Sequence, residues 1–141
     1  MKIVRISVAI LFATVAIAIN ASAADKATAM KAGEAVYTKY CKTCHQATGA
    51  GMPGVYPPLA KADYLKTKDK KIIIDNVVNG LKGEITVNGK KYKGVMTPLP
   101  KQYTDEDAAN VITYIMNNWG NSGPVITAAE VKKIRKVAGK K

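Results

Sequence analysis

The sequence is poor in the side chains from which most enzyme sites and zinc sites are built. Its 141 residues contain a single histidine, His45, and two cysteines, Cys41 and Cys44. A structural zinc site needs four ligands, which is more than these three residues supply. A Ser-His-Asp triad would have to use the same histidine, and no glycine-rich phosphate-binding loop is present. Metal or thiol chemistry in this chain must therefore centre on one short segment.

Arginine and acidic side chains are also scarce. The chain has 22 basic and 10 acidic residues, for a net charge of +12, and only Arg5 and Arg135 among the basic residues are arginine. Proteins that bind nucleic acids usually have more arginine, with aromatic residues between the charges. We therefore expect no nucleic-acid binding. The positive charge instead indicates attraction to partner proteins with acidic docking surfaces.

Long apolar runs are absent apart from residues 6–19. Lys2 and Arg5 precede this run, and the small residues Ala21-Ser22-Ala23 follow it, as in a secretory signal peptide. A membrane anchor is the alternative, but it would need a longer run of roughly 20 apolar residues. The pattern predicts a signal peptide over 1–23 and a periplasmic protein with no stable membrane insertion. We expect a single domain over 24–141.

The segment Cys41-Lys42-Thr43-Cys44-His45 has the C-x-x-C-H pattern of covalent haem attachment. Two cysteines three residues apart at the end of a helix can both add to the haem vinyl groups, and the histidine then lies under the iron. A thioredoxin-like redox pair shares C-x-x-C, but its βαβ context is missing. A plain disulfide remains an alternative in an oxidising compartment. The motif predicts one covalently attached haem c with its iron.

The remaining patterns predict a mainly α fold with one hairpin. Asn88-Gly89 is a strong two-residue turn signal. Thr104 with Asp107 and Thr127 with Glu130 have the capping pattern of helix starts. The expected elements are helices over 30–40, 70–81 (ended by Gly83), from 104 to about 119, and from 127 onward, a hairpin over 85–92, and loops over 49–58 and 95–103.

The chain resembles the class I c-type cytochromes over nearly all of its length after the signal peptide. Gly33, Tyr37 and Cys41 follow one another at a spacing of four, as in the first helix of that family. In the family this glycine packs against an aromatic residue of the last core helix, here Tyr114. The resemblance implies a small helical domain around one covalent haem, with the short β-hairpin before the loop that carries the axial methionine.

The resemblance also implies the residues around the iron. Pro57-Pro58-Leu59 begins 12 residues after His45, where a family proline carbonyl accepts a hydrogen bond from the ligand histidine. We assign this role to Pro57, with Pro58 as the alternative. The sixth ligand is expected to be Met96, with His45 the other axial ligand. Thr97 departs from the commoner family pattern by separating this methionine from Pro98. Met52 is expected at the haem edge and Met116 within the last core helix.

An iron with both axial positions filled transfers electrons rather than binding a substrate. We therefore expect no enzyme activity, and a periplasmic electron carrier that cycles between Fe(III) and Fe(II). The lysines near the haem edge, such as Lys42 and Lys61, would meet the redox partners. The alternative is a cytochrome c subunit of a periplasmic oxidoreductase complex such as a dehydrogenase. A ligand-binding or peroxidase-like haem protein would require Met96 to be absent from the iron. The basic extension over 124–141 is predicted to be a solvated terminal helix or a docking element.

Overall fold

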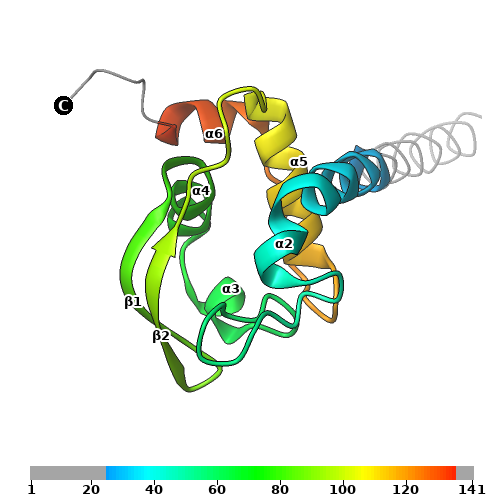
Figure 1. The fold of residues 1–141 in the computed structure, drawn as a ribbon. Coiled ribbons are helices and arrows are strands. Elements are labelled where there is room, and N and C mark those ends of the chain that lie inside the picture. Colours follow the sequence, from blue (N-terminus) through cyan, green and yellow to red (C-terminus); the bar gives the residue numbers. More distant parts are fainter. Residues whose placement is uncertain (1–24, 136–141) are drawn as a thin grey trace, which may run out of the picture.

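The computed structural model describes residues 25–135, so the predicted signal peptide lies outside the described residues. Helices and one β-hairpin surround a central space (Figure 1). Within residues 25–135 no helix is both long enough and apolar enough to cross a membrane. The mainly helical fold with a hairpin confirms the predicted class. The elements are a helix over 25–36, η1 (Tyr37–Cys41), α2 (Lys42–His45), α3 (Asp63–Thr67), α4 (Lys70–Asn79), β1 (Leu81–Val87), β2 (Lys90–Met96), α5 (Asp105–Asn117) and α6 (Ala128–Ile134).

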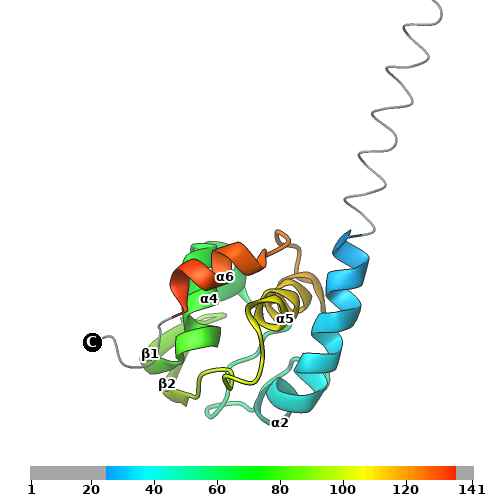
Figure 2. The ribbon, with the colours of Figure 1, turned by 90° about the horizontal axis from the view of Figure 1, so that it is seen from above.

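The N-terminal helix crosses α5 at a glycine (Figure 2). A Cβ atom on Gly33 would lie 2.7 Å from the Cβ of Tyr114 and would overlap the backbone of Asn110. Any larger residue would therefore separate the two helices. The predicted contact between Gly33 and Tyr114 is confirmed.

Three aromatic side chains hold the segment after α2 against these helices. The rings of Tyr37, Tyr114 and Trp119 lie with their centroids between 4.9 and 5.5 Å apart. Gly49, at φ +67°, lies against Trp119, where a Cβ would come within 2.7 Å of the indole ring. The Tyr37 hydroxyl donates to the carbonyl of Gln46 at 2.6 Å. This cluster, which includes the single tryptophan of the chain, thus fixes the position of α2.

The hairpin turns at Asn88-Gly89, as predicted, with φ of +49° and +75° at the two residues. It is longer than the predicted 85–92, because pairing continues to Leu81 opposite Met96. The loop predicted over 95–103 therefore begins two residues later than expected, at Thr97. The predictions also missed α3, whose Asp63 exchanges two hydrogen bonds of 2.7 and 2.9 Å with Asn88 at the turn.

The predicted end of the helix over 70–81, here α4, is wrong. The helix ends at Asn79 rather than at Leu81, and Gly80 rather than Gly83 follows its last residue. Gly80 has φ of +82°, and a Cβ there would lie 2.8 Å from the carbonyl oxygen of Met96. The close approach of the strand that ends at Met96 therefore requires glycine at the position directly after the helix.

The last two helices begin with the predicted capping boxes. Thr104 accepts from the amide of Asp107 and donates its own amide to that carboxylate, and Thr127 and Glu130 repeat the arrangement. Helix α6 lies over α4 and α5 (Figure 2). Its Val131 is fully buried, while Lys132 and Lys133 are exposed. One face of the C-terminal extension thus belongs to the core.

An ion pair between α4 and α6 gives this contact a pH dependence. Lys70 Nζ lies 2.6 Å from a carboxylate oxygen of Glu130. This hydrogen bond, aided by the amide of Thr127, lowers the pKa of Glu130 from its ordinary value to about 2.

We expect Glu130→Gln to lower the melting temperature by no more than a few degrees, because both side chains of the pair are partly exposed to solvent. A carboxyl with a depressed pKa stabilises the fold above its unfolded pKa, and this contribution disappears as the pH falls towards 2. Melting curves of wild type and variant, recorded between pH 6 and pH 2, should therefore converge as the pH falls. A constant difference across this range would contradict the account.

Candidate haem site

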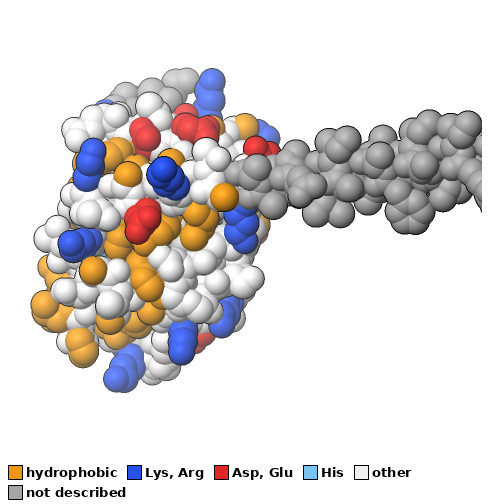
Figure 3. Space-filling model, turned by 90° about the vertical axis from the view of Figure 1, so that its right-hand side faces the viewer, with side chains coloured by type: hydrophobic (Ala, Val, Ile, Leu, Met, Phe, Trp, Pro, Cys, Tyr) orange, Lys and Arg blue, Asp and Glu red, His pale blue; other side chains and the backbone are white. Residues whose placement is uncertain are grey.

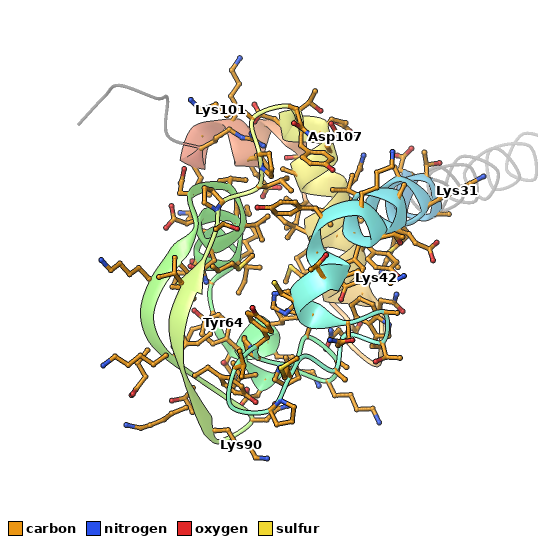
Figure 4. All side chains as sticks on the ribbon, in the orientation of Figure 1. Lys31, Lys42, Tyr64, Lys90, Lys101 and Asp107 are labelled. Carbon is orange, nitrogen blue, oxygen red and sulfur yellow. The ribbon has the colours of Figure 1, made fainter. Side chains whose placement is uncertain are left out.

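A cavity of about 680 Å³ lies between the hairpin and α4 on one side and α2 and α5 on the other. Cofactor sites typically have volumes of roughly 300–1,000 Å³ and mainly apolar walls. Tyr64 of α3 points towards this space in Figure 4, whereas Lys90 extends outward from the hairpin. The apolar side chains of its wall include Leu65, Ile73, Val77, Ile85, Ile112 and Ile115.

The C-x-x-C-H segment reaches the cavity at the end of the long N-terminal helical segment. Cys41, Cys44 and His45 all line it, and both thiols are free. Residues three and four apart lie on the same side of a helix, which is why one short turn presents all three side chains together. A π-helical turn, a feature common near functional sites, ends at the first cysteine, Cys41.

The environment of Cys41 does not favour thiolate chemistry. Burial, and next the charge of Cys44, raise the pKa of this thiol to about 12. Redox-active pairs instead have at least one cysteine with a lowered pKa. Within residues 25–135, no three His, Cys, Asp or Glu side chains form a cluster that could hold a metal ion. The site therefore resembles neither a thioredoxin-like pair nor a zinc centre.

His45 is buried and oriented by one hydrogen bond. Its Nδ1 lies 3.0 Å from the carbonyl oxygen of Pro57, the contact predicted from the sequence. A carbonyl oxygen can only accept, so Nδ1 carries the hydrogen and Nε2 keeps a lone pair. Burial lowers the pKa of His45, although the hydrogen bond to Pro57 opposes this effect. The neutral imidazole thus has one nitrogen available for a metal.

The loop after His45 bends back to present this carbonyl. The amide of Gly51 donates to the carbonyl of His45 at 3.0 Å. Gly51 has φ of +66°, and a Cβ there would lie 2.6 Å from the carbonyl oxygen of Pro57. Glycine is required at this position because the two backbone segments touch.

Met96 lines the cavity from the end of β2, on the other side of the central space from α2 (Figure 1). It is the one methionine of the described residues that does so. Met116 is buried in α5, away from the cavity. Met52 itself does not line the cavity: it is 44% exposed, and the neighbouring Gly54 and Val55 line it. Its place at the haem edge stays a prediction. An isolated β-bridge pairs Met52 with Tyr56 in this part of the loop.

Sequence reasoning missed two residues beside Met96. Tyr40 and Thr97 line the cavity, and their hydroxyl oxygens lie 2.9 Å apart. They are 57 positions apart, so no local pattern could pair them. The departure of Thr97 from the commoner family pattern was the one available signal.

The mouth of the cavity combines exposed apolar and basic side chains. Val55 is 53% exposed and Val95 is 69% exposed, and Lys39 and Lys93 line the cavity beside them. Lys42 and Lys61, which the sequence analysis placed near the edge, do not line it. Figure 3 shows a different face, the right-hand side of Figure 1, where basic and acidic side chains are scattered between hydrophobic ones.

These residues fit a covalently bound haem. The apolar walls match its macrocycle, two free thiols can form thioethers with its vinyl groups, and a neutral imidazole and a thioether are suitable iron ligands. The cavity thus offers the donors that the C-x-x-C-H motif predicted, together with the apolar volume that they require.

Comparison with known proteins gives the same answer. The family model for cytochrome c matches residues 30–119. Cytochrome c-552 of Thermus thermophilus is 40% identical over 111 residues, which cover 73% of this chain and 83% of that protein. The cytochrome c subunit of a quinone-dependent alcohol dehydrogenase from Gluconacetobacter polyoxogenes is 30% identical over 110 residues, or 77% of this chain but 23% of that subunit.

The match to the family model begins at the N-terminal helix and ends just after α5. It therefore covers the haem-attachment motif and both walls of the cavity. Together with the free thiols and the oriented histidine, it shows that the chain belongs to the class I c-type cytochromes, electron-transfer proteins that bind haem c covalently.

Proposed function

We propose that the protein is a monohaem electron carrier of the periplasm, with haem attached to Cys41 and Cys44 and iron ligated by His45 and Met96. The observation that carries this proposal is that His45 and Met96 line one cavity, with the Nδ1 of His45 already engaged by Pro57. When bound, haem c supplies a one-electron Fe(III)/Fe(II) couple. The signal peptide predicted over 1–23 supports the periplasmic location.

Each of the proposed site residues has a separate role in this proposal. Cys41 and Cys44 hold the cofactor by two thioethers. Pro57 fixes the tautomer and orientation of His45, which makes Nε2 a better ligand. The soft sulfur of Met96 favours ferrous iron and raises the reduction potential. With both axial positions filled by the protein, no substrate binds without displacing a ligand, so the chain transfers electrons without catalysing a reaction.

The exposed mouth of the cavity is the proposed route for electrons. Val55 and Val95 form an apolar rim that a partner can cover, and Lys39 and Lys93 lie beside it. Such charges steer acidic partners to this face before contact.

A second candidate function is that of a cytochrome subunit bound permanently to a dehydrogenase. The observation in its favour is the similarity to the cytochrome c subunit of an alcohol dehydrogenase. The match to cytochrome c-552 covers most of both chains, whereas this chain spans only 23% of the dehydrogenase subunit, and this favours a protein that acts as one small domain.

Replacing Met96 tests the ligand assignment. Met96→Ala should retain the covalent haem, because both thioethers remain, but should open the sixth position. The oxidised variant should lose the weak far-red sulfur-to-iron absorption, its potential should fall, and its reduced form should bind carbon monoxide readily. Absorption spectra with and without carbon monoxide measure these changes. Met52→Ala is the matched control and should behave as wild type. Rapid carbon monoxide binding by wild type at neutral pH would instead favour a ligand-binding protein.

Salt dependence separates the carrier from the permanent subunit. Steered association can approach about 10⁸–10⁹ M⁻¹ s⁻¹ at low salt and slows as ions screen the charges. Stopped-flow electron transfer to an acidic partner protein should therefore slow as salt rises. The double variant Lys39→Glu/Lys93→Glu should weaken this dependence more than Lys132→Glu/Lys133→Glu, whose charges lie on α6. An electron-transfer rate that does not change with salt concentration, together with co-purification of a catalytic chain at high salt, would contradict the free-carrier proposal.

A further inference from the structure

The segment that follows Met96 is packed tightly on one side. The amide of Leu99 donates to the carbonyl of Val77 in α4 at 2.8 Å. A Cβ on Gly80 would lie 2.8 Å from the carbonyl oxygen of Met96 and 3.2 Å from Cδ of Pro98. The end of α4 therefore supports the backbone directly before and after Thr97 and limits its movement in that direction.

On its other side the same segment is held by one tyrosine hydroxyl. Tyr40 Oη lies 3.0 Å from the carbonyl oxygen of Pro98 and 2.9 Å from Oγ1 of Thr97. A tyrosine hydroxyl has one hydrogen, and the carbonyl can only accept. Tyr40 must therefore donate to Pro98 and accept from Thr97. The direction of both hydrogen bonds follows from the chemistry of the groups.

The tyrosine itself belongs to the haem-attachment helix. Tyr40 lies in η1, one residue before Cys41. Its ring is 6.2 Å from that of Tyr103, at an angle of 53°. One hydroxyl thus connects the helix that carries Cys41 and His45 with the segment that begins at Met96, across the two walls of the cavity.

We propose that Tyr40 and Thr97 are positioning residues that hold Met96 on the iron. This inference rests on the proposed assignment of Met96 as the sixth ligand. The contacts with Gly80 and Val77 limit movement towards α4. Met96 can leave the iron for long only if its segment shifts relative to Tyr40, and such a shift breaks the two hydrogen bonds of that residue. Thr97, the residue that departs from the commoner family pattern, supplies the hydroxyl for one of them.

Binding of imidazole to the oxidised holoprotein measures how often Met96 leaves. At saturating imidazole the observed rate equals the rate at which the methionine dissociates. The loss of the far-red absorption measures this rate. Tyr40→Phe keeps the ring and its contact with Tyr103 but removes both hydrogen bonds, so the rate should rise about 10-fold. Thr97→Val removes one bond with little change in shape and should raise the rate about 3-fold.

Two control variants separate positioning from general packing. Thr97→Ser retains a hydroxyl at the same position and should bind imidazole at nearly the wild-type rate. Tyr103→Phe keeps the ring beside Tyr40 and removes a hydroxyl that takes no part in these bonds, so it should also match wild type. The reduction potential should fall in Tyr40→Phe and stay unchanged in Tyr103→Phe.

The outcomes distinguish failure of this inference from failure of the ligand assignment. A wild type that lacks the far-red absorption would overturn the assignment of Met96, and this inference with it. A wild type with the absorption, together with a Tyr40→Phe variant of unchanged rate, would overturn the positioning role alone. An equal increase in the imidazole-binding rate in Thr97→Ser and Thr97→Val would also overturn the positioning role alone. If Tyr40→Phe fails to accumulate as holoprotein, the comparison of Thr97→Val with Thr97→Ser decides.

Discussion

The apolar cavity between the hairpin and α2 determines how the rest of the chain is built. A chain with one tryptophan and one phenylalanine encloses about 680 Å³ of mainly apolar volume. Unfilled apolar volume in a protein core costs stability. Tyr37, Tyr114 and Trp119 are grouped behind α2, so they fix the attachment helix instead of filling the cavity. This arrangement makes a covalently held apolar cofactor part of the core, and the two thioethers proposed at Cys41 and Cys44 would keep it there.

Much of this architecture could be predicted from the sequence because the decisive signals are local. Each of these signals determines the structure of residues only a few positions away. They are the C-x-x-C-H segment, the Asn88-Gly89 turn and the capping residues Thr104 and Thr127. Family resemblance extended these predictions to the contact of Gly33 with Tyr114. It also led to the hydrogen bond between His45 and Pro57, which is present in the structure.

The features that the sequence did not predict depend on contacts between residues that are distant in the chain. Gly80, which follows α4, lies against the backbone of Met96, a residue 16 positions further along the chain. The hairpin extends to Met96 because Leu81 pairs with it. The short helix α3 is held by the exchange of hydrogen bonds between Asp63 and Asn88. The link from Tyr40 to Thr97 belongs to the same class, since only the folded chain brings the two hydroxyls together.

Some residues around the cavity fix the positions of the proposed ligands, and others leave the mouth of the cavity accessible to partner proteins. Pro57 orients one proposed ligand, and Tyr40 and Gly80 confine the segment of the other. Helix α6 adds to this rigid frame, because the buried Val131 packs behind α4 and α5. Val55 and Val95 leave the mouth exposed to partners. An electron carrier needs both properties: a site that changes little between redox states, and an edge that another protein can approach.

The central claim is that one haem is bound covalently through both cysteines, and intact mass spectrometry of the denatured protein tests it most directly. The account predicts a polypeptide heavier by the mass of one haem, and a Cys41→Ala/Cys44→Ala variant without this addition. A wild-type polypeptide of unmodified mass, with haem extracted into acidified organic solvent, would contradict it.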